Sequence, residues 1–300
     1  MKNGSKKMIL ADLSLLLVAL FWGGGFVAVK EAINSITPFY MIAIRFGIAS
    51  LILLAIFWKR FKNINWQDIK ISIIVGIFLF LAFSAQTTGA QYTTAGKQAF
   101  LTAVNVVIVP FLTWILYKNE LDAYSIIASV FCLIGVGFLT LKDGLSINIG
   151  DFLTLVCAFL FAVHIALLGE YAKKVDTIVL SIIQMATASV LALVCALFTE
   201  PVPESLPANA YFSMVYMIIF STMLAFMIQT IAQKYTTANH ASLILCLEAV
   251  FGSVLAAIFL GDVFTPSMII GCGLIFIGII IAETKLKFLQ SNKKEAEVKI

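Results

Sequence analysis

Residues 86–95 read QTTGAQYTTA and residues 229–238 read QTIAQKYTTA, so six of the ten positions are identical at an offset of 143. Further positions correspond at this or a nearly equal offset: Gly135 with Gly278, Asp12 with Asp151, and Arg45 with Gln184. Several matches in order at a nearly constant offset indicate an internal repeat. We therefore expect two related halves, residues 1–147 and 148–284, followed by a tail of residues 285–300.

The composition around this repeat is that of an integral membrane protein. Hydrophobic residues make up 61% of the chain and charged residues only 12%, with a mean hydropathy of +1.04. A soluble domain carries about 25% charged residues. The net charge of +4 is small and gives no reason to expect nucleic acid as a partner. The five cysteines lie in apolar runs without a CxxC pair, which disfavours disulfides and zinc.

Ten apolar runs approach the roughly 20 residues that a membrane-spanning helix needs. They are Leu10–Val29, Pro38–Phe57, Ile71–Gly89, Gln98–Tyr117, Ala123–Leu141, Ile149–Leu168, Ile178–Phe198, Tyr211–Ala232, His240–Leu260 and Ser267–Ala282. Five spans in each half is an odd number, so the second half must enter the membrane upside down. We expect an all-α membrane protein of ten transmembrane helices, arranged as two inverted five-helix repeats, which is a recurring plan among transporters.

The basic residues give the orientation of these spans. With the N-terminus inside, the inner segments carry 16 Lys and Arg residues and the outer segments 3; Arg45, within a span, completes the total of 20. Positive residues favour the cytoplasmic side. We therefore expect both termini in the cytoplasm.

Several motifs in this order resemble the drug/metabolite transporter superfamily, in its ten-helix EamA-type branch. They are FWGGGFVAVK at 21–30, Pro38 with Arg45-Phe46, TTAGKQAFLTAVNVVIVP at 93–110, LILCLEAVFGSVLAAIFLGD at 243–262 and GCGLIFIGI at 271–279. One departure is Gly261-Asp262, where the family usually has Gly-Glu. The resemblance implies export or uptake of a metabolite. We expect a secondary transporter of the cell (inner) membrane that works as an exporter by alternating access. Its substrate would be a small metabolite, such as an amino-acid-like, cationic or other amphipathic solute, which the fold alone does not select.

Glu248 is the candidate substrate-binding residue of most interest, because it lies near the middle of a span. Its counterpart at offset 143 is Asn105, which forms a polar stripe with Gln98 and Thr102. Burial disfavours a charged carboxylate. Glu248 is thus expected either to exchange a proton or pair with a cationic substrate group, or else to hold helices together.

A second candidate set combines amides and aromatic rings. Phe83 with Gln86, and Phe226 with Gln229, share one helix face in each half. Such faces suit a cavity for an amphipathic solute, although interhelical packing would also explain them. Asp12 and Asp151 begin predicted spans, and helix capping is the better explanation for both.

Three further candidates complete the substrate-binding set. Arg45, near the middle of its span, either contacts an anionic group in the pathway or satisfies backbone carbonyls. His164 is either a pathway residue or a hydrogen-bonded packing residue. Trp22, before three glycines, either forms a wall of the site or marks close helix packing.

Competing functions remain open at this point. No GxxxxGK[ST] motif occurs, which disfavours ATP-driven transport by this chain. An integral membrane enzyme would need clustered acids or histidines, and only His164 and His240 are present. A non-transporting membrane partner would be expected to add a soluble module.

We expect no cofactor or metal; the lipid bilayer, a small-molecule substrate and protons are the expected partners.

Overall fold

Every predicted apolar run is largely helical in the structure, a computed structural model that describes residues 2–140, 148–203, 207–259, 261, 263 and 265–284. No strand occurs among these residues. Helices suit a bilayer because each backbone N–H and C=O group is satisfied within its own segment. The predicted tail, residues 285–300, lies outside the described residues.

The helices follow one another along the chain with short connections. They are α1 (Lys2–Ala32), α2 (Pro38–Phe57), a 3₁₀ segment (Trp58–Asn63), α3 (Trp66–Gly89), α4 (Ala95–Thr102), α5 (Asn105–Tyr117), α6 (Ala123–Thr140), α7 (Ile149–Tyr171), α8 (Thr177–Thr199), α9 (Ala208–Tyr216), a π-helical segment (Met217–Leu224), α10 (Ala225–Gln233), α11 (Ala238–Leu245), α12 (Leu247–Phe259) and α13 (Pro266–Thr284). In the described part of the chain, seven helical stretches are long and apolar enough to cross a membrane. Three shorter apolar helices, Asn105–Tyr117, Ala123–Gly135 and Pro266–Gly278, lie within the other predicted spans.

Two predicted spans are interrupted by non-helical turn residues, contrary to the expectation from hydropathy. The run Gln98–Tyr117 breaks between α4 and α5 at residues 103–104, and the run His240–Leu260 breaks between α11 and α12 at Cys246. Backbone hydrogen bonds tighten to the i−3 pattern at both places. Pro110 lies only in the first, so proline is not the common cause.

The two broken segments are built alike at the offset of 143. Thr94 caps α4 by accepting from the Lys97 N–H at 3.2 Å, and Thr237 caps α11 by accepting from the His240 N–H at 3.2 Å. The break at Ala103 corresponds to the break at Cys246. The sequence repeat is therefore also a repeat of local structure.

Helix pairing follows the same correspondence. At the contact of α6 with α13, a Cβ added to Gly135 would meet the Gly271 carbonyl at 2.8 Å, and one added to Gly278 would meet the Ala128 carbonyl at 2.8 Å. Residues 128 and 271 are themselves 143 apart, so the contact is reciprocal. Glycine is needed at both positions because the backbones approach so closely.

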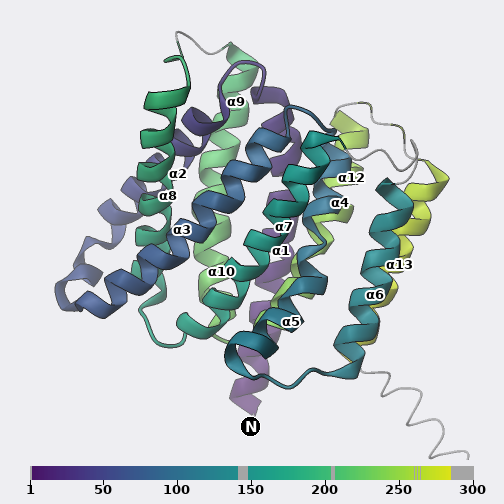
Figure 1. Ribbon diagram of the computed structural model, residues 1–300. Helices are drawn as coiled ribbons and strands as arrows, with labels where there is room; N and C mark the ends of the chain where they lie inside the picture. Colours follow the sequence, from purple (N-terminus) through teal and green to yellow (C-terminus); the bar gives the residue numbers. More distant parts are fainter. Residues whose placement is uncertain are drawn as a thin grey trace, which may run out of the picture.

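The packing of the longer helices places the breaks inside the bundle. Helix α1 packs against α12, α3 against α7, and α2 against α8. Figure 1 shows that α1 starts at the end of the molecule marked N, whereas α7 starts at the opposite end, with α6 and α13 side by side along one edge. The first helices of the two halves thus run in opposite directions.

The two aspartates predicted as helix caps differ in the structure. Asp151 does cap α7, in a capping box with Asn148. The prediction for Asp12 was wrong, because α1 begins at Lys2 and Asp12 lies within it. Its carboxylate instead lies 3.0 Å from His240 Nε2.

Candidate functional site

A cavity lies beside the breaks of the α4–α5 and α11–α12 segments. Lining residues come from α1, α2, α3, α7, the π-helical segment, α10 and both broken segments. The space that the centres of water molecules can occupy is about 40 Å³. That volume holds only a few waters, because one water needs about 10–15 Å³ by this measure. A metabolite would fit only if side chains or helices moved.

One end of this cavity is acidic and polar. Glu248 lies in the first turn of α12, just after the break, and is 5% exposed. Its carboxylate has no hydrogen bond or ion pair among the described residues. Asn105 starts α5 at the corresponding break, and its Oδ1 has no hydrogen-bond partner. The two breaks therefore bring repeat counterparts to one cavity.

Gln229 adds a further unsatisfied group on this side. Its side chain is fully buried and lines the cavity, yet neither its Oε1 nor its Nε2 has a hydrogen-bond partner. Leaving a buried polar group unpaired costs about 1–3 kcal/mol. Such groups are normally paired with protein or water, so Gln229 points to a ligand or to ordered water.

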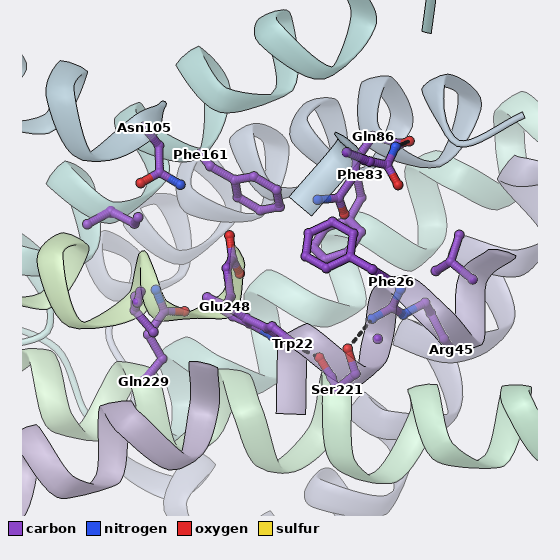
Figure 2. Close-up of a pocket in the computed structure, with 15 residues that line it drawn as sticks. Trp22, Phe26, Arg45, Phe83, Gln86, Asn105, Phe161, Ser221, Gln229 and Glu248 are labelled. Carbon is purple, nitrogen blue, oxygen red and sulfur yellow. Dashed lines mark hydrogen bonds between the residues drawn. The ribbon is translucent and has the colours of Figure 1, made fainter. Parts of the chain in front are cut away.

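The other end of the cavity is basic. Arg45 is 2% exposed; its Nε donates to Thr222 Oγ1 at 2.7 Å and its Nη2 to Ser221 Oγ at 3.2 Å. Its guanidinium also lies 4.8 Å from the Phe83 ring centre. No carboxylate pairs with Arg45 within the described ranges. Figure 2 shows Glu248 and Asn105 on one side and Arg45, bonded to Ser221, on the other.

Aromatic rings form much of the wall between these ends. Trp22, Phe26, Phe83 and Phe161 line the cavity. The Phe83 and Phe161 rings meet edge to face with centres 5.2 Å apart. Trp22 Nε1 donates to the Ser221 carbonyl at 3.1 Å, which fixes the indole. The wall therefore offers flat apolar surface with few free polar atoms.

The structure brings most of the predicted site residues together. Glu248, Asn105, Gln229, Arg45, Gln86, Phe83 and Trp22 all line the cavity. Thr102 lies beside it, accepting from Gln86 Nε2 at 3.3 Å. Phe226 is fully buried behind the wall, with its ring centre 5.2 Å from that of Trp22.

His164 does not line the cavity. It is fully buried, and its Nε2 lies 2.9 Å from Gln184 Oε1, while Gln184 Nε2 donates to Thr230 Oγ1 at 3.1 Å. This network links α7, α8 and α10. The geometry favours the packing role over the pathway role for His164.

Sequence reasoning missed several lining residues, among them Phe26, Phe161, Gln98 and Ser221. Phe161 stands at offset 139 from Trp22, so the repeat itself carried the signal for it. Gln98 was recognised as part of a polar stripe but not as a site residue. Ser221 lines the cavity from the π-helical segment, and no local sequence pattern predicts that segment.

A bundle of apolar helices that encloses a polar cavity at helix breaks is the architecture of a multi-pass membrane transporter. Comparison with known proteins identifies the family. The profile of the EamA-like transporter family matches residues 9–141 and 148–284. The chain belongs to this family, within the drug/metabolite transporter superfamily. Membership implies a lipid bilayer environment and a small-molecule substrate.

Individual relatives agree with this assignment. An uncharacterized transporter of Archaeoglobus fulgidus is 34% identical over 280 residues, covering 93% of this chain and 88% of its own. The uncharacterized transporter YoaV of Bacillus subtilis is 25% identical, covering 91% and 96%. A crystal structure with 17% sequence identity superimposes with a TM-score of 0.77 over 93% of this chain and 98% of its own, which shows a shared fold. These names indicate transporters rather than enzymes.

Proposed function

We propose that this protein is a secondary transporter for a small amphipathic zwitterion, such as an amino-acid-like metabolite with an apolar or aromatic side group. The observation that carries this proposal is the pairing of charges in one cavity: Glu248 and Arg45 line the same space, and neither has an ion-pair partner among the described residues. An ammonium group would bind at Glu248 and a carboxylate at Arg45, with the aromatic wall between them.

The proposed mechanism is alternating access between two inverted five-helix halves. Support comes from the matched breaks and caps at offset 143, from the reciprocal contact of α6 with α13, and from the opposite starts of α1 and α7. A site between inverted halves can be exposed to either side when the halves exchange conformations. The small cavity volume fits a state closed around the site.

We further propose that the protein lies in the cell (inner) membrane with both termini in the cytoplasm and acts as an exporter. The excess of Lys and Arg on the inner segments supports the cytoplasmic placement of the termini. Glu248 is also the proposed site for a coupling proton, because the same carboxylate can hold either a proton or an ammonium group.

Counterflow in proteoliposomes tests the substrate class. Vesicles loaded with an aromatic α-amino acid should accumulate the labelled amino acid, whereas its methyl ester and its N-acetyl derivative should not compete. The ester removes the carboxylate for Arg45, and acetylation removes the ammonium for Glu248. Equal competition by both derivatives would refute the charge pairing.

A cationic solute is the second candidate, favoured by one specific observation. The Arg45 guanidinium already donates to two hydroxyl groups, Thr222 Oγ1 and Ser221 Oγ, so it can be satisfied without a substrate carboxylate. For a cationic substrate the methyl ester would compete as well as the parent amino acid, and only the N-acetyl derivative would fail. The same counterflow experiment thus separates the two candidates.

A further inference from the structure

Two acid–base pairs occupy corresponding places in the two halves. Lys97 Nζ lies 2.6 Å from Asp151 Oδ2, and His240 Nε2 lies 3.0 Å from Asp12 Oδ1. Lys97 and His240 are 143 apart, and Asp12 and Asp151 are 139 apart. These are the two offsets that relate the halves elsewhere, so the pairs are structural counterparts.

Each pair joins the first helix of one half to the broken segment of the other. Lys97 of α4 binds Asp151 of α7, and His240 of α11 binds Asp12 of α1. Helices α1 and α7 start at opposite ends of the molecule (Figure 1). Lys97, Asp151 and His240 are each the third residue of their helix, and Asp12 lies in the first half of α1. The pairs therefore close opposite ends of the bundle, with the cavity between them.

Behind the Asp12–His240 pair the bundle is sealed by small apolar side chains. Leu15, Val18, Ala162 and Ala241 are fully buried in one cluster, which continues to Leu245 on the cavity wall. One path from the cavity to this end separates α1 from α11, which pack against each other. That movement cannot occur without breaking the contact between Asp12 and His240.

The two pairs differ in chemistry. A lysine side chain is ordinarily charged over the physiological pH range, whereas a histidine side chain ordinarily gains or loses its charge between about pH 5 and 8. Asp151 is held further by Thr93 Oγ1 at 3.0 Å and by the Asn148 N–H at 3.1 Å. The Asp12–His240 contact is within ion-pair distance but lacks hydrogen-bond geometry, and both side chains are 26% exposed.

We propose that Asp12 and His240 form a proton-binding latch at the inner end of the transporter, and that Lys97 and Asp151 form its fixed-charge counterpart at the other end. A proton taken up by the His240 imidazole makes the ion pair and holds the inner end closed. Its loss weakens the pair and favours opening. This inference rests on the proposed transport function, because a latch is needed only where the ends open in turn.

Other charged and titratable groups lie on α1 itself and near the ends of the elements that pack against α1 and α11. They are Lys7 of α1, Tyr117 and Lys118 at the end of α5, Glu170 and Tyr171 of α7, and Lys234 and Tyr235 at the end of α10. Lys7 lies over the Tyr235 ring at 5.6 Å, and Glu170 pairs with Lys174, so several of them have contacts of their own. The test must therefore change His240 itself.

Thiol labelling of purified full-length protein, without substrate, tests the latch. The reporter is Val18→Cys in a background that lacks the five native cysteines, and each rate is divided by that of the denatured protein at the same pH. A partly exposed ion pair is worth up to about 1 kcal/mol, so labelling should be on the order of two- to fivefold faster at pH 8 than at pH 6. His240→Lys should be slow at both pH values, and His240→Gln fast at both.

A matched variant at the opposite end serves as the control. With Lys97→His the Val18→Cys reporter should still be labelled faster at pH 8 than at pH 6, and a Val29→Cys reporter should now also be labelled faster at pH 8. A pH response that persists in His240→Lys, or none in the parent reporter, would overturn the latch.

If His240→Lys fails to insert, Asp12→Asn decides instead: fast labelling at both pH values supports the latch, and an unchanged pH response overturns it. Labelling needs no substrate, so failure of every counterflow substrate would reject the transport proposal without altering this result.

Discussion

Glu248→Gln should have opposite effects on the stability of the protein and on its affinity for substrate. The carboxylate is 5% exposed and has no hydrogen bond or ion pair among the described residues, so the folded protein holds an uncompensated polar group. Glutamine keeps the shape and removes the charge. We expect this change to leave the thermal unfolding temperature unchanged or raise it, because burying an unpaired charge is unfavourable.

The magnitude of the binding defect follows from the lost interaction. A hydrogen bond to a charged group contributes about 1.5–3 kcal/mol. At 1.4 kcal/mol for each factor of ten, loss of the ammonium–carboxylate contact should weaken binding roughly 10- to 150-fold. Protonation of the native carboxylate removes the same contact, so acid should weaken substrate binding by the native protein. The variant has no such proton site and should bind equally weakly at all pH values.

Counterflow at graded substrate concentrations and several pH values, beside thermal unfolding of the same preparations, measures both effects. Glu31→Gln is the matched control, because Glu31 is exposed at the end of α1 and faces no cavity. It should change neither quantity. Unaltered affinity and pH profile in Glu248→Gln would assign Glu248 to helix packing and refute the reasoning. A loss of stability with unchanged transport would do the same.

The remaining predictions concern packing, the cavity wall and topology. A Cβ added to Gly76 would lie 2.6 Å from Thr187 Cβ and 2.7 Å from the Gln184 carbonyl oxygen. Gly76→Ala should therefore lower the free energy of unfolding, measured by denaturant titration, by about 1–3 kcal/mol. Gly137→Ala is the control, because a Cβ added to Gly137 would have no atom within 4 Å. Cysteines replacing Phe83, Gln86 and Gln229 should react with small hydrophilic thiol reagents and be protected by substrate, whereas one replacing Phe226 should not; inertness of all four would favour packing. Reporter fusions after Lys62, Lys174 and the C-terminal tail should report cytoplasm and fusions within residues 201–207 the outside, and a cytoplasmic signal from that loop would contradict ten spans.

The sequence predicted the helices well because a bilayer leaves the backbone little choice. It predicted most of the cavity because intramembrane polar residues are few, and Glu248, Asn105 and Arg45 stood out against apolar neighbours. It did not predict the breaks at residues 103–104 and at Cys246. Neither lies at a glycine or proline, so tertiary packing rather than local preference determines them. Hydropathy also placed the start of the first helix too late, which led to the wrong role for Asp12.

Comparing corresponding positions of the two halves helps to distinguish residues with a structural role from residues with a chemical role. Positions that are alike in both halves, such as the capping Thr94 and Thr237, repeat a structural task. Some pairs at the cavity and its ends differ: Asn105 corresponds to Glu248, and Lys97 corresponds to His240. Two identical halves would favour neither side of the membrane, and these differences break that equivalence. If the proposed latch sets the pH response, exchanging Lys97 and His240 should transfer that response from one end of the protein to the other.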